Sequence, residues 1–269
     1  AKVLPEGGND PESIIFTSTY DLWLSQNMGS LFSPVERFAQ IGTGIMGIDV
    51  VEDLIVVAEA NGEIWSTNNA FETVDYVGVA IPIPGSKEWQ TEEPAVKIRM
   101  FDANTWLISQ RRGRVLQTTD GGQSWQAVID EPFDYDSLTI QSESAIIASP
   151  DGILMSVDHG ESWTLVAGSP LDCTHLSWRD SKIAAACADG LFLSENDGRD
   201  WVPLPIEVTP WSVDISPLDT NRIFVGSMDT FYASFDGGDT FSPHKNGLTN
   251  SDIAHLATDL ESLSQRTAA

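Results

Sequence analysis

The chain has 269 residues, with 40 Asp and Glu against 14 Lys and Arg, so its formal net charge is −26. So acidic a surface repels phosphate backbones, which argues against nucleic acid as a partner, and it indicates either a basic partner or adaptation to high salt. No apolar run reaches the roughly 18 residues that a transmembrane helix needs, and the length suits one large all-β domain.

The predicted elements begin after a polar N-terminal extension, residues 1–13, with an apolar strand at Ile14–Thr17. Similar apolar strands rich in β-branched residues recur along the chain, each as the second strand of a repeated unit. They are expected at Leu54–Ala58, Thr105–Ser109, Ala145–Ser149, Lys182–Ala186 and Arg222–Gly226. Residues 251–257 are expected to form a last inner strand, and a polar tail follows at residues 259–269.

Each repeated unit carries the same short turn phrase, in which Ser or Thr, Asp or Asn, and Gly alternate with variable residues before an aromatic residue. The four well-preserved copies are Thr118-x-Asp120-x-Gly122-x-Ser124-Trp125, Ser156-x-Asp158-x-Gly160-x-Ser162-Trp163, Ser194-x-Asn196-x-Gly198-x-Asp200-Trp201 and Ser234-x-Asp236-x-Gly238-x-Thr240-Phe241. Two degenerate copies precede them, Ser25-x-Asn27-x-Gly29-x-Leu31-Phe32 and Ser66-x-Asn68-x-Ala70.

The residue types of the phrase are those that a stable hairpin turn needs. The Asp or Asn oxygen accepts hydrogen bonds from backbone N–H groups of its own turn. The Gly adopts backbone angles that other residues resist, and the aromatic ring buries a large apolar face beside the strands. We therefore interpret these residues as structural and not as catalytic or metal-binding.

The spacing of the phrases predicts the architecture. Copies recur about every 40 residues, as expected for one four-stranded blade per repeat. The sequence therefore predicts an all-β fold, a six-bladed β-propeller of four-stranded antiparallel blades over residues 14–258. The N-terminal strand Ile14–Thr17 lacks an inner neighbour, so residues 251–257 are expected to pair with it, complete one shared blade and close the ring.

The turn phrases resemble the Asp-box, or bacterial neuraminidase repeat, of sialidases, sortilin-type receptors and photosystem assembly-factor propellers. The segment from Gly113 to Trp125 is most similar to the assembly factors, although those usually have seven blades. This resemblance implies a non-enzymatic scaffold that binds other proteins, as an assembly factor or extrinsic subunit of a larger complex such as a photosynthetic one. It favours an extracytoplasmic position, in a periplasm or lumen, peripheral to a membrane. A structural component of a virus particle is an alternative.

A sialidase-like glycosidase or a glycan-binding lectin is a further alternative. A sialidase needs several arginines that converge on a carboxylate, together with a Tyr nucleophile. The arginines here divide between two predicted faces, with Arg37, Arg111 and Arg112 on one and Arg179, Arg199 and Arg222 on the other. Tyr20 beside Asp21 is equally well explained by turn chemistry. The histidines lack metal-ligand spacing, so no metal is predicted. The sequence likewise predicts no catalytic residue and no cofactor.

Two features that interrupt the repeat are candidate partner contacts, because loops on a rigid scaffold often carry function. One is an insertion over about Val79–Pro94, where Ile83, Lys87 and Trp89 are candidate interface residues. The other is the pair Arg111 and Arg112, the densest positive charge in the chain. Both are predicted on the face opposite the turn phrases. Packing of the insertion on its own blade, and simple solvation of the arginines, are the alternatives.

The two cysteines, Cys173 and Cys187, are predicted to face each other across a hairpin that turns near residues 179–181. A cross-strand disulfide there would indicate an oxidising compartment. Two reduced, buried thiols are the other outcome.

Overall fold

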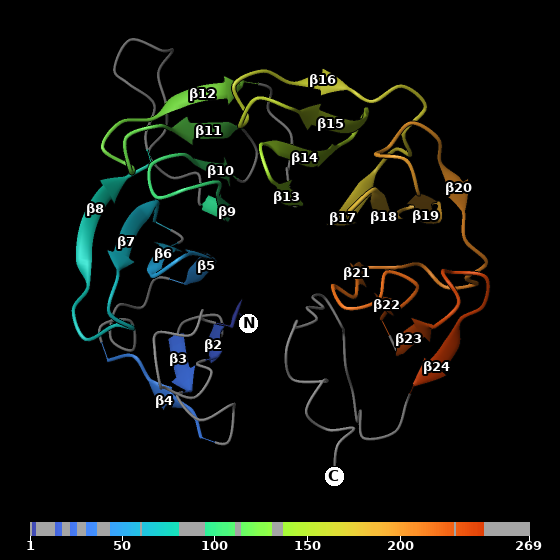
Figure 1. The fold of residues 1–269 in the computed structure, drawn as a ribbon, viewed down its shortest axis with the longest axis horizontal. Coiled ribbons are helices and arrows are strands. Elements are labelled where there is room, and N and C mark those ends of the chain that lie inside the picture. Colours follow the sequence, from blue (N-terminus) through green and yellow to red (C-terminus); the bar gives the residue numbers. More distant parts are fainter. Residues whose placement is uncertain are drawn as a thin grey trace. The chain divides into compact units, whose positions relative to one another are not determined.

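The computed structural model describes residues 2–3, 14–17, 22–25, 31–36, 44–59, 61–80, 95–110, 114–130, 137–228 and 230–244. In these ranges the chain forms six four-stranded sheets, each with its strands in chain order (Figure 1). Neighbouring strands run antiparallel, as hairpin-connected strands do. The described part of the chain contains no helix with the length and hydropathy to cross a bilayer.

The first three sheets come from the N-terminal half of the chain. Their strands are β1 (Lys2–Val3), β2 (Ile14–Thr17), β3 (Leu22–Ser25), β4 (Ser33–Pro34); β5 (Ile45–Val51), β6 (Leu54–Glu59), β7 (Glu63–Thr67), β8 (Asp75–Val79); and β9 (Ala95–Met100), β10 (Trp106–Gln110), β11 (Val115–Thr118), β12 (Gln126–Ile129).

The other three sheets follow in the same pattern. Their strands are β13 (Leu138–Gln141), β14 (Ser144–Ser149), β15 (Gly152–Ser156), β16 (Thr164–Leu165); β17 (Cys173–Arg179), β18 (Lys182–Cys187), β19 (Gly190–Ser194), β20 (Val202–Pro203); and β21 (Ser212–Ile215), β22 (Ile223–Gly226), β23 (Phe231–Ser234), β24 (Ser242–His244).

Four of the second strands, β6, β10, β14 and β18, are deeply buried. In β6, β14 and β18 every residue after the first is buried, and in β10 every residue is. Their near-continuous apolar sequences fit this burial, since a strand covered on both faces needs no alternation. The expected second strands agree with β2, β6, β10, β14, β18 and β22 to within one residue at either end.

The inner edge of the first sheet differs from the prediction. Lys2 pairs with Ile15 and Val3 with Ile14, so β1 occupies the place expected for residues 251–257 beside these two residues. The expected pairing of the N-terminal strand with a C-terminal strand is wrong there, because an alternative partner lies a few residues upstream and makes the shorter connection. Residues 251–257 lie outside the described part of the chain, and the predicted limits at 1–13, 14–258 and 259–269 stay predictions.

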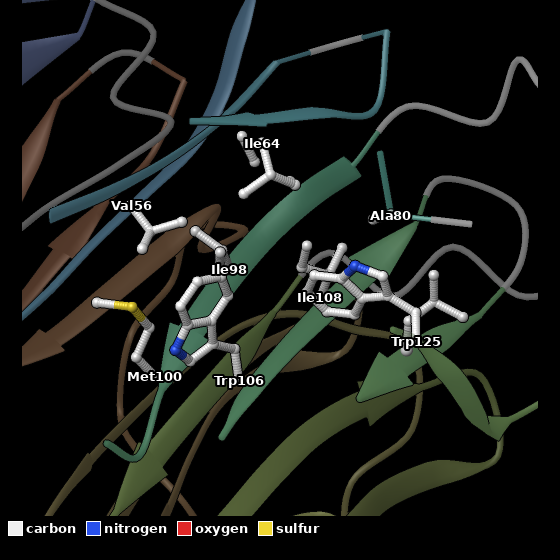
Figure 2. Close-up of a cluster of buried hydrophobic side chains, with 10 residues drawn as sticks. Val56, Ile64, Ala80, Ile98, Met100, Trp106, Ile108 and Trp125 are labelled. Atoms are coloured by element: carbon white, nitrogen blue, oxygen red, sulfur yellow. The ribbon is translucent and has the colours of Figure 1, made fainter. Parts of the chain in front are cut away.

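The chain divides into two compact units, residues 1–143 with 157–163, and residues 144–156 with 164–269. In the first unit, one cluster packs Val56, Ile64, Ile98, Ile108 and the rings of Trp106 and Trp125 (Figure 2). A second cluster in this unit centres on Leu22, Val35, Ile45, Ile55 and Val57.

In the second unit, the sheets β17–β20 and β21–β24 bury a core against each other. Ala184, Ala186 and Leu193 pack with Val213 and Ile215. The small residues of β18 allow the two sheets to approach closely, and the larger apolar side chains of β21 and β22 fill the space between them.

Hydrogen bonds link consecutive inner strands inside each unit. In the first unit the backbone N–H of Met100 on β9 donates to the buried Asp49 carboxylate on β5, at 2.8 Å. In the second unit the N–H of Ile215 on β21 donates to the Ser177 hydroxyl on β17, at 3.0 Å. That hydroxyl in turn donates to Asp214, at 2.9 Å. A side chain at the same inner-strand position therefore joins two sheets in both units.

Candidate functional site

The turn that begins at Thr118 shows how a well-preserved copy is built. The Thr118 hydroxyl accepts the N–H of Gly122 at 2.9 Å and donates to Asp120 Oδ1 at 2.8 Å. Asp120 accepts the backbone N–H and the hydroxyl of Ser124 at 2.9 and 2.5 Å. Trp125 folds back so that its Nε1–H donates to the Gly122 carbonyl at 3.1 Å, and the ring is 2% exposed.

The same bonds recur in the later copies. The carbonyls of Gly160 and Gly198 each accept the indole N–H of the Trp three residues later, at 2.9 Å in both turns. The hydroxyls of Ser194 and Ser234 each accept the N–H of the phrase glycine, at 2.8 Å. The predicted structural residues Asp120, Asp158, Asn196 and Asp236 each accept the backbone N–H four residues later. Hydrogen bonding within the turn thus accounts for these residue types.

The Asp236 carboxylate has a strongly lowered pKa. Hydrogen bonds from the Thr240 hydroxyl first, then from the Thr240 N–H and the Ser234 hydroxyl, lower the pKa of Asp236 from 3.8 to about 2. Because the folded pKa lies below the unfolded one, the ionised carboxylate stabilises the fold above about pH 3.8, and this contribution is lost as the pH falls toward 2.

Removing the hydroxyl donor is expected to raise this pKa. In Thr240→Val the NMR titration midpoint of the Asp236 carboxyl carbon should move upward toward 3.8. Thr164→Val, which alters an exposed threonine on strand β16 of another sheet, serves as the control and should leave the midpoint in place. A midpoint equally low in Thr240→Val would contradict the assigned cause.

The second sheet carries its turn one residue later than the sequence indicated. The Thr67 hydroxyl accepts the N–H of Phe71 at 3.2 Å and donates to Asn69 Oδ1 at 2.8 Å, and Asn69 accepts the N–H of Thr73 at 3.0 Å. The phrase is therefore Thr67-x-Asn69-x-Phe71-x-Thr73-Val74, and the predicted copy Ser66-x-Asn68-x-Ala70 is wrong in register. Thr73 has a hydroxyl at the position of Ser124, and this residue is the signal in the sequence that would have given the correct register.

This Thr67 turn keeps the hydrogen bonds of the repeat but not its packing residues. Phe71 takes the glycine position with φ of +68°, where Gly122, Gly160, Gly198 and Gly238 have φ of +89°, +85°, +80° and +101°. A bulky residue in the left-handed region is strained, and such outliers cluster at functional sites. Val74 takes the position of Trp125, so this turn has a much smaller side chain where the aromatic ring would fold back.

An open groove with a volume of about 610 Å³ lies against the Thr67 turn and the residues from β3 to just beyond β4, all in the first unit. Its apolar lining comes from Leu24, Leu31, Pro34, Val35, Phe71 and Val74. We call this surface the turn groove. Leu31 stands in the first turn phrase at the position that Ser124 has in the Thr118 turn. It is 66% exposed, a large value for a leucine.

Acidic side chains complete the turn groove. Glu36 and Glu72 both belong to its lining and both are exposed. An apolar floor with a few polar groups at its margin is the usual composition of a ligand-binding surface. The carboxylates, within a chain of net charge −26, favour a positively charged ligand.

The predicted partner residues Ile83, Lys87, Trp89, Arg111 and Arg112 lie outside the described residues, so their role stays a prediction. Cys173 and Cys187 form a disulfide with their Cα atoms 3.7 Å apart, opposite each other on β17 and β18.

The charged and metal-ligating residues outside the groove make local contacts. In the described ranges, no three His, Cys, Asp or Glu residues gather closely enough to hold a metal ion. Arg114, Arg179 and Arg222 each lie near an acid of their own sheet or of a neighbouring element, at 2.8, 3.8 and 3.2 Å.

Solved structures share this fold at low sequence identity. A structure of YCF48 bound to D1 peptide has a TM-score of 0.68 at 13% identity, and the match covers 93% of this chain and 84% of that chain. YCF48 from Cyanidioschyzon merolae has a TM-score of 0.65 at 15% identity, with coverage of 93% and 89%. The GH74 enzyme of Niastella koreensis has a TM-score of 0.65 at 16% identity, covering 87% of this chain but 44% of the enzyme.

A β-propeller fold fits these neighbours, and at such identities the likeness concerns the fold. No protein-family model and no curated protein matches the sequence.

Proposed function

We propose that this chain is a non-enzymatic protein–protein interaction module, an assembly factor or extrinsic subunit of a larger complex, with the turn groove as a contact surface. The observation that carries the proposal is the exposure of Leu31 on an open apolar groove. Large exposed apolar surfaces rimmed by polar groups mark interaction sites. The resemblance of the turn phrases to the Asp-box of assembly-factor propellers supports the same function.

Two of the structural neighbours bear on this proposal. One structural neighbour, YCF48, is seen with a D1 peptide, so a chain of this fold binds a protein segment. Glycoside hydrolysis is the competing function, since a GH74 enzyme shares the fold. Glu36 and Glu72 are two exposed carboxylates beside an apolar floor, a composition that suits a surface for a basic segment. The groove therefore favours binding over catalysis.

Site-specific photo-crosslinking tests the proposed function. A photoreactive phenylalanine analogue in place of Leu31 should form covalent protein adducts in native extract, with at least about tenfold more product than at Leu165. Leu165 is the matched control, because it is an exposed leucine, 52% accessible, on the outer strand of another sheet. Adducts should disappear when excess unlabelled protein competes.

Equal labelling at the two positions would count against the turn groove as an interface. Release of reducing sugar from a β-glucan, or of the fluorophore from a sialoside, would count against a non-enzymatic function. Variants at Trp89 and Arg111 test the other predicted surface separately, since weaker capture there would add a second contact.

A further inference from the structure

Four turns of this chain end in an aromatic residue, which is buried or partly buried. Trp125, Trp163 and Trp201 place the indole over the turn, and each donates its N–H to the glycine carbonyl, at 3.1, 2.9 and 2.9 Å. Phe241 stands at the same position in the last described turn. In the three Trp copies the indole thus closes over its own turn.

The Thr67 turn lacks this closure. Val74 replaces the aromatic residue, and it lines the turn groove together with Phe71, which replaces the glycine. The hydrogen bonds by which Asn69 and Thr67 organise the turn are nevertheless present. The backbone geometry of the repeat is therefore retained where its aromatic side chain is missing, and the valine in its place lines an open groove.

We propose that the turn groove receives an aromatic side chain from a partner peptide, which takes the place of the turn's missing ring. This inference rests on the proposed function, and it names the chemistry of the partner. The anchor is a Trp or Phe, because the groove adjoins a turn that packs an aromatic ring in its other copies. Its sequence neighbours are Lys or Arg, because Glu36 and Glu72 line the same groove.

A direct binding measurement tests the aromatic anchor. The probe is a short fluorescein-labelled peptide with one Trp between lysines, titrated with the purified full chain and followed by anisotropy. A twin peptide with Ala in place of Trp should bind at least about tenfold more weakly, since aromatic anchors dominate peptide affinity. A twin with Glu in place of Lys should also bind more weakly, and binding of the Lys peptide should weaken as salt is added.

The variant Val74→Trp tests the location, because it supplies the missing ring from within the chain. It should lose at least about tenfold in affinity for the Trp peptide while its melting temperature stays equal or rises. Val157→Trp is the matched control, since Val157 is a 69% exposed valine in a turn that already has its own Trp163. This control should bind the peptide as the wild type does.

A second variant keeps the test decisive if Val74→Trp fails to fold. Leu31→Lys places a positive charge on a side chain that is already 66% exposed, so the fold should be unaffected while the Lys-flanked peptide is repelled. Wild-type affinity in both Val74→Trp and Leu31→Lys would overturn the proposal. So would equal binding of the Trp and Ala peptides, or self-association through this groove in sedimentation runs.

The crosslinking experiment separates the two levels of the inference. If Leu31 crosslinks to a protein but the Trp peptide does not bind, the proposed function stands and the aromatic anchor is wrong. If neither occurs, both fail.

Discussion

Replacing Gly122 with alanine is expected to lower the free energy of unfolding by about 3 kcal/mol. Two effects add at this position. Its φ is +89°, which an L-residue resists, and a Cβ there would lie 2.7 Å from Val77 Cγ1 and 2.9 Å from the Trp106 ring. The Trp106 ring is buried in the cluster of Figure 2, so it has little room to move away. Urea denaturation followed by Trp fluorescence measures the loss.

The neighbouring Gly121 provides the matched control for this substitution. It also has positive φ, +69°, but a Cβ there would meet its nearest atom at 3.6 Å, an ordinary contact. Other copies place Ala70, His159 and Asp197 at this position with φ of +50°, +59° and +57°. Gly121→Ala should therefore cost only about 1 kcal/mol. Equal losses at the two positions would show that the close contact at Gly122 contributes nothing.

Breaking the disulfide is expected to have the second large effect. The bond between Cys173 and Cys187 closes a short loop, with a sequence separation of 14. Loop closure of this size is worth about 3 kcal/mol, mainly through the unfolded chain. In a domain of this size the double variant Cys173→Ala, Cys187→Ala should therefore melt roughly 10 °C lower than the oxidised wild type. Differential scanning calorimetry measures the shift.

Treatment with a phosphine reductant supplies the control for the double variant. The reductant should lower the melting temperature of the wild type and leave that of the double variant unchanged, because the variant has no bond to reduce. A reductant that affects the two proteins alike, or neither, would contradict a stabilising role for this bond.

The repeated turn made much of the fold predictable. The phrase around Asp120 and Gly122 combines hydrogen-bond acceptors with a residue that tolerates positive φ. The conformation of the turn therefore depends on residues within the phrase, and it can be predicted from the sequence. The second strands were equally clear, because a strand such as Lys182–Cys187 is buried and apolar at every residue after Lys182.

Other features depended on information that is not local. The partner of Ile14 and Ile15 was mispredicted, because a two-residue strand such as Lys2–Val3 has no periodicity to detect. The Thr67 turn was shifted by one residue, since Phe71 replaced the glycine that marks the phrase. The turn groove was not predicted either. In the sequence, Phe71 and Val74 look like simple degeneration of the repeat, and only the positions of β3 and β4 show that these two residues line a groove.

The hydrogen-bonded frame of each turn is independent of the aromatic side chain beside it. Thr67 and Asn69 hold their turn as Thr118 and Asp120 hold theirs, although one turn is capped by a ring and the other is not. The residue at the aromatic position can therefore be exchanged without rebuilding the backbone of the turn. Under the proposed function, a chain assembled from such hairpins can change what it binds while its architecture stays constant.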